Sequence, residues 1–176
     1  MMRTSACFAL IAALTFGTAA SGHDGPHVTD PQIAHIAYTA GQIDVAAARQ
    51  ALAKSKNPDV RAFAQTMVRD HEAVNGQAIA LVKKLGVAPE ANPISAALSE
   101  GAAARLSDLD RLDGAAFDRA YAANEVAFHG TVNGALRSTL IPGAKNGELK
   151  SLLETGLALF LERQGHAEHL ARELGR

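Results

Sequence analysis

The sequence has a single cysteine, Cys7, and no tryptophan. Cys7 lies within the first 22 residues, which have the pattern of a signal peptide, so the mature chain has no thiol. This excludes disulfides and thiolate metal sites. Any transition metal would have to be held by His, Asp and Glu, the donors that suit iron, copper, zinc or nickel.

The chain also lacks an excess of positive charge and a long apolar run. With 17 basic and 18 acidic residues the formal charge is −1, and nucleic-acid-binding domains usually carry an excess of positive charge. Beyond the signal pattern, no stretch reaches the 18 or so uncharged apolar residues of a membrane helix. We therefore expect no nucleic-acid partner and no transmembrane segment.

Residues 1–22 combine the positive charge of Arg3 with an apolar stretch over Cys7–Phe16. A small-residue cleavage site follows at Thr18–Ala20 or Ala20–Gly22. We predict an exported, periplasmic protein with a flexible lead over 23–30 and one domain over 31–176. Cleavage after Ala20 would leave Ser21-Gly22-His23 at the amino terminus, a square-planar donor set for copper or nickel.

The remainder shows apolar residues at helical spacing, no strand pattern and abundant alanine. Asp30-Pro31 and Asn57-Pro58 each predict a helix start, and Gly86, Asp113-Gly114 and Pro142-Gly143 predict breaks. The predicted helices are Pro31 to about Ser55, Pro58 to Leu85, Ile94 to Leu112, Ala115 to Leu140 and Gly147 to Leu174. This order predicts an all-α, ferritin-like four-helix bundle of two antiparallel hairpins, with an extra short connecting helix.

One histidine interrupts the apolar seam of the second predicted helix. His71 follows Val60, Ala64 and Met67 at the spacing of a core-facing stripe. A buried imidazole needs a partner, and counting back from the turn near residue 56 places Asp44 within roughly 3 Å of the height of His71. Two interpretations follow. The residues form either a buried pair whose polar groups hydrogen-bond to each other, or two ligands of a metal.

The second predicted hairpin adds further candidates. Glu125 and His129 are four residues apart on one face, and Glu162, His166 and His169 share another. Counting from the turn places Glu125 and Glu162 at the same height along the bundle axis. The same count separates His129 from His166 by about 12 Å along that axis. The alternative for Glu162 and His169 is a solvated surface near the carboxyl end. The metal-ligand candidates are Asp44, His71, Glu125, His129, Glu162 and His166.

Two asparagines could support the imidazoles. Asn75 follows His71, and Asn133 follows His129, by four residues each. At that spacing they lie one turn further along and are candidates to orient the rings. His35 lies about half a turn around its helix from Asp44, and we expect it to point outward.

Over Ile33–Leu174 the chain resembles the exported bacterial family known as domain of unknown function 4142. The resemblance rests on Lys54–Ala64, Met67–His71 with Asn75, Gly114–Tyr121 and His129. It implies a ferritin-like helical bundle with histidines at His71, at His129 and near His166, and Asp44 stands where the family usually has glutamate. Ferritin-type sites use Glu-x-x-His. This chain has Glu-x-x-x-His twice, so ferroxidase chemistry does not carry over.

These observations lead to two hypotheses. The first is an exported helical-bundle protein that binds iron, copper or zinc through His and carboxylate side chains in its core. The alternative is a metal-free envelope or stress protein that acts by binding a partner, with a structural His-Asp pair. No catalytic triad order, phosphate loop or cofactor fingerprint points to a particular reaction.

Overall fold

A computed structural model describes residues 28–176, which are almost entirely helical and contain no strand in that range. The predicted signal peptide, the Ser21–His23 motif and most of the predicted lead lie outside the described residues. The helices are α1 (Asp30–Lys54), α2 (Pro58–Leu85), α3 (Pro93–Asp110), α4 (Gly114–Ala135), the π-helical turn η1 (Leu136–Leu140), α5 (Ile141–Gly143) and α6 (Gly147–Leu174). Within 28–176, none is long and apolar enough to cross a membrane.

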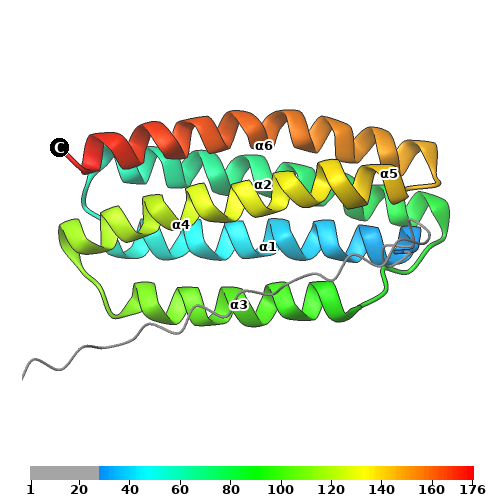
Figure 1. The fold of residues 1–176 in the computed structure, drawn as a ribbon, viewed down its shortest axis with the longest axis horizontal. Coiled ribbons are helices and arrows are strands. Elements are labelled where there is room, and N and C mark those ends of the chain that lie inside the picture. Colours follow the sequence, from blue (N-terminus) through cyan, green and yellow to red (C-terminus); the bar gives the residue numbers. More distant parts are fainter. Residues whose placement is uncertain (1–27) are drawn as a thin grey trace, which may run out of the picture.

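Four long helices form the bundle, and each packs against antiparallel neighbours (Figure 1). The hairpins α1–α2 and α4–α6 pair through α2 with α6 and through α1 with α4. The connecting helix α3 runs back along the outside of α1 and α4. The prediction of an all-α bundle with a connecting helix is therefore confirmed.

Side-chain caps explain why most helices begin where they do. The side-chain oxygen of Asn57 accepts hydrogen bonds from the backbone N–H groups of Asp59 and Val60, and Asn146 caps α6 in the same way. The predicted cap of α1 is wrong by one residue. Thr29 is the cap, and it forms a reciprocal capping box with Gln32.

The predicted break at Pro142-Gly143 is also wrong, because the chain stays helical through Gly143. Proline lacks the N–H that an α-helix needs in its interior. The wider π turn Leu136–Leu140 ends two residues before Pro142, and such turns adjust the hydrogen-bond register of a helix. The chain leaves the helix only at Ala144, which has an extended conformation.

The core consists of two apolar clusters at the two ends of the bundle. One includes Ala48, Met67 and Tyr121, and the other includes Ile33, Leu136 and Leu153. Between these clusters lies a group of buried polar side chains that includes Asp44, His71, Glu125 and His129. The fold thus places a polar layer midway along an otherwise apolar interior.

Candidate metal centre

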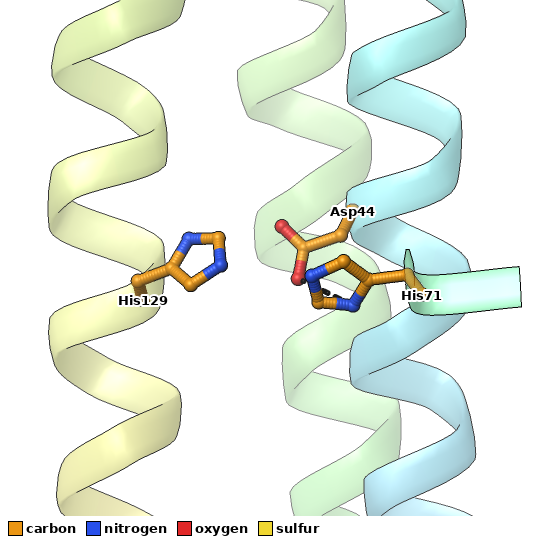
Figure 2. A group of neighbouring side chains, drawn as sticks. All are labelled: Asp44, His71 and His129. Atoms are coloured by element: carbon orange, nitrogen blue, oxygen red, sulfur yellow. Dashed lines mark ion pairs between the residues drawn. The ribbon is translucent and has the colours of Figure 1, made fainter. Parts of the chain in front are cut away.

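Three side chains from three helices meet in this polar layer. Asp44 of α1, His71 of α2 and His129 of α4 are each at most 3% exposed. They point toward one another across the bundle (Figure 2), and each offers a ligand atom within 4.8 Å of the other two. The Nδ1 of His71 lies 3.4 Å from the Oδ2 of Asp44, which confirms the pairing predicted from turn counting.

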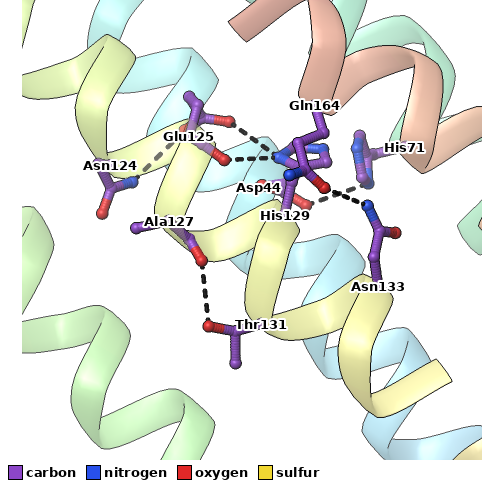
Figure 3. A network of polar contacts seen from close by, with 9 residues as sticks. All are labelled: Asp44, His71, Asn124, Glu125, Ala127, His129, Thr131, Asn133 and Gln164. Carbon is purple, nitrogen blue, oxygen red and sulfur yellow. Dashed lines mark hydrogen bonds and ion pairs between the residues drawn. The ribbon is translucent and has the colours of Figure 1, made fainter. Parts of the chain in front are cut away.

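The tautomer of His129 follows from its hydrogen bond to the backbone. Its Nδ1 lies 3.0 Å from the carbonyl oxygen of Glu125, one turn earlier on α4 (Figure 3). Because a carbonyl can only accept, Nδ1 carries the proton. The buried Nε2 is left with a lone pair and no hydrogen-bond partner. Metal-bound histidines show this same arrangement, with the second ring nitrogen tied to a carbonyl or carboxylate.

His71 is less well satisfied than His129. Neither of its ring nitrogens has a hydrogen bond of good geometry within the described residues, although the whole side chain is buried. Its ring stacks face to face on Phe160 of α6, with centroids 4.7 Å apart and planes 3° from parallel. An unpaired buried polar group lowers the stability of the folded protein by about 1 to 3 kcal/mol. Binding of an ion or molecule to the ring nitrogens of His71 would remove this cost.

Burial keeps both imidazoles neutral at ordinary pH. Loss of solvation, with a smaller contribution from the nearby His129, lowers the pKa of His71 to about 3. Burial likewise lowers the pKa of His129 to about 4, against the raising effect of its bond to the Glu125 carbonyl. Neutral imidazole is the form that binds metals.

A fourth group, Glu125, lies beside the three. It is fully buried, and burial raises its pKa to about 8, against the lowering effect of hydrogen bonds with Asn124 and Asp44. Burial and the proximity of Glu125 also raise the pKa of Asp44 well above its usual value. The two carboxyl groups therefore retain a proton at neutral pH. A divalent cation could replace it.

The residues present fit a transition-metal ion. Two neutral imidazoles with one or two carboxylates are a common donor set for such ions. Donors about 2.1 Å from an ion lie at most about 4.2 Å apart, so small side-chain rotations would close the 4.8 Å set around it. Buried atoms without hydrogen bonds gather here: Asp44 Oδ1, His71 Nδ1 and Nε2, Glu125 Oε2 and His129 Nε2.

The structure does not bring Glu162 and His166 into this layer. The Glu162 side chain is 58% exposed and lies 3.4 Å from the Arg163 guanidinium, so it does not share the buried layer with Glu125. His166 is exposed, and its Nδ1 accepts a hydrogen bond of 2.9 Å from Arg163. His169 is also exposed, and His35 is half-buried on α1. The residue of α6 that faces the cluster is Phe160.

Sequence reasoning missed Arg163. Its side chain is 10% exposed and forms an ion pair of 2.9 Å with Asp70, the residue before His71. Arg163 continues the inward seam of α6 that includes Phe160 and Ala167. It interrupts that seam as His71 interrupts the seam of α2, so the same periodicity test could have found it.

The asparagines do not support the imidazoles as predicted. Asn133 donates a hydrogen bond of 2.9 Å to Gln164 of α6 (Figure 3). Asn75 packs against Gly41 of α1, where a Cβ atom would lie 2.9 Å from its Cγ. Both side chains therefore pack against neighbouring helices instead.

Together these features define an all-α bundle with a buried carboxylate–imidazole cluster. The chain belongs to the family described as domain of unknown function (DUF4142), whose family model matches residues 16–170. No curated protein matches the chain. Among solved structures, the chain is similar to CopM in the Cu(II)-bound form, with a TM-score of 0.63 and 14% identity over 84% of this chain and 98% of that chain. At this identity the likeness is one of fold.

Proposed function

We propose that this protein binds a divalent transition metal in the core of its bundle, through Asp44, His71 and His129, with Glu125 as a further carboxylate. One observation carries the proposal: ligand atoms from three helices converge in a buried layer without hydrogen bonds to satisfy them. The predicted signal peptide would place this activity in the periplasm. The bundle would then hold or buffer the metal.

Copper is the first ion to test. Divalent copper binds nitrogen and oxygen donors more tightly than the other first-row ions, and the similar bundle of CopM was solved in a Cu(II)-bound form. Iron and zinc accept the same donors. The role of this chain's residues is to present two neutral imidazoles and to release the carboxyl proton as the ion enters.

The test is equilibrium dialysis of the untagged, chelator-treated protein against Cu(II), Zn(II) or Fe(II), followed by metal analysis. The protein carries His23→Ala, because a Ser21-Gly22-His23 terminus would bind copper by itself. We expect about one equivalent of metal, and we expect His71→Ala to weaken binding by at least about tenfold because it removes a ligand.

The matched control is His35→Ala, which removes a histidine of α1 outside the cluster and should leave the affinity unchanged. Stoichiometry below about one tenth of an equivalent for all three ions would contradict the proposal. So would equal losses in the two variants. Either result would favour the alternative, in which the Asp44–His71 pair only fixes the packing of a metal-free protein.

A further inference from the structure

An apolar cavity of about 260 Å³ lies inside the bundle next to the polar layer. Its walls come from all four long helices and from the π turn, and they include Ala37, Val74, Val132, Leu136, Leu153 and Phe160. The well-packed interiors of proteins contain few voids larger than a water molecule. A void of this size is therefore a feature of the fold that needs an explanation.

The cavity is distinct from the candidate metal centre. Phe160 belongs to both, because it lines the cavity and stacks on His71. None of Asp44, His71, Glu125 and His129 lines the cavity. The phenyl ring thus forms a shared wall between a polar layer that suits a metal and an apolar space that does not.

The lining determines which chemical class would bind. No charged side chain lines the cavity, so an ion would lose its hydration without compensation. The polar side chains of the lining are Asn75, Thr131 and Thr139. Asn75 is 5% exposed, and its Nδ2 has no acceptor among the described residues. A neutral ligand with an acceptor oxygen would satisfy this amide.

The volume sets the size of the ligand. An apolar cavity of about 150 Å³ in another protein stays dry and binds benzene, so 260 Å³ suits roughly ten non-hydrogen atoms. Two of the lining residues, Ile94 of α3 and Thr131 of α4, are exposed. The cavity therefore reaches the surface near the start of α3, which gives a ligand a way in.

We propose that this cavity binds a neutral, hydrocarbon-rich molecule of about ten non-hydrogen atoms that carries a carbonyl oxygen. The hydrocarbon part fills the apolar space between the helices, and the carbonyl accepts a hydrogen bond from Asn75. Binding does not require a metal, so this site stands or falls independently of the proposed function.

The test uses the metal-free full chain with a chelator present and 2-nonanone as the probe. Methyl NMR of the wild-type protein should show shifts confined to cavity residues such as Val74, Val132 and Leu153. The charged analogue nonanoate should bind at least about tenfold more weakly, because a single amide N–H does not compensate for the lost hydration of its carboxylate. Asn75→Ala should reduce the affinity for 2-nonanone, because it removes the donor to the carbonyl oxygen.

A matched pair of substitutions on α4 locates the site. Ala135 lines the cavity, whereas Ala123 is exposed on the same helix. Ala135→Leu should fill part of the space and weaken binding by at least about tenfold, while Ala123→Leu should not. Equal binding by the two folded variants would overturn the proposal. If Ala135→Leu does not fold, the wild-type experiment decides: absent shifts, or shifts spread over other methyl groups, would also overturn it.

Discussion

In the polar layer, burial shifts the pKa values of two histidines and two carboxyl groups in opposite directions. Burial lowers the pKa values of His71 and His129 and raises those of Asp44 and Glu125. All four shifts favour the neutral form, because an unpaired charge is poorly solvated in the core. The metal-free layer is therefore uncharged except where the pH forces a proton on or off.

The stability of the metal-free protein should fall as the pH rises from about 7 to 8. In this range the unfolded Glu125 is ionised while the folded carboxyl keeps its proton, so the folded state binds more protons and loses stability at up to about 1.4 kcal/mol per pH unit. Glu125→Gln should flatten this slope. Urea unfolding at several pH values measures it.

The histidines contribute a slope of opposite sign that is centred near pH 6.5. Their folded pKa values are lowered, so they destabilise the protein as the pH falls through about 6.5, and between pH 6 and 7 they offset part of the carboxyl slope. Because both proteins carry the two histidines, the difference between wild type and Glu125→Gln over pH 7 to 8 reports the carboxyl group. Identical slopes for wild type and Glu125→Gln in that range would mean that folded Glu125 is already ionised.

Gly41 lies in close contact with the side chain of Asn75 on α2. A Cβ atom there would collide with the Asn75 side chain on α2, so Gly41→Ala should lower the free energy of unfolding by about 1 to 3 kcal/mol. The control is Gly76→Ala on α2, where a Cβ atom meets nothing within 4 Å and a gain of about 0.4 to 1 kcal/mol is expected. Urea denaturation compares them, and equal stability would contradict the close contact.

At the scale of elements, Asp30 ties the start of α1 to the connection before α6. Its carboxylate accepts hydrogen bonds of 2.8 Å from the backbone N–H groups of Lys145 and Asn146. Asp30→Ala should cost about 1 to 2 kcal/mol and speed hydrogen exchange at these two amides. Asp59→Ala is the matched control, because Asp59 occupies the first turn of α2 and is exposed. Unchanged exchange in Asp30→Ala would show that this contact does not hold the connection.

Element boundaries were largely predictable because their signals are local. Asn57-Pro58 and Gly86 mark the ends of α2 within a few residues of chain. The exception at Pro142 is instructive. Its usual effect is to end a helix, but the π turn before it lets the helix continue to Gly143.

At the scale of the whole molecule, a bound ion would link α1, α2 and α4. Each helix supplies one ligand, so only the folded protein presents the complete set. In the His23→Ala protein, Cu(II) at about 100 times its Kd should therefore add about 2.7 kcal/mol to the stability. For a domain of this size that corresponds to a rise of roughly 5 to 10 °C in Tm.

Thermal unfolding monitored by circular dichroism, with and without Cu(II), measures this rise. It should disappear in His71→Ala, persist in His35→Ala and shrink at acidic pH, where protons compete for the ligands. A rise of equal size in the two variants would place the copper elsewhere on the protein.

The sequence by itself determined the helices, their antiparallel pairing and the meeting of Asp44 with His71. Caps, breaks and hydrophobic period act between near neighbours, and the turn of only a few residues between α1 and α2 leaves little freedom in their register. Only the tertiary structure decided that His129 joins that pair, while Phe160 and Arg163 point inward and Glu162 and His166 face solvent. Each residue rotates the side-chain direction by about 100° around a helix, so packing between the hairpins, and not spacing along the chain, selects the face that meets the core.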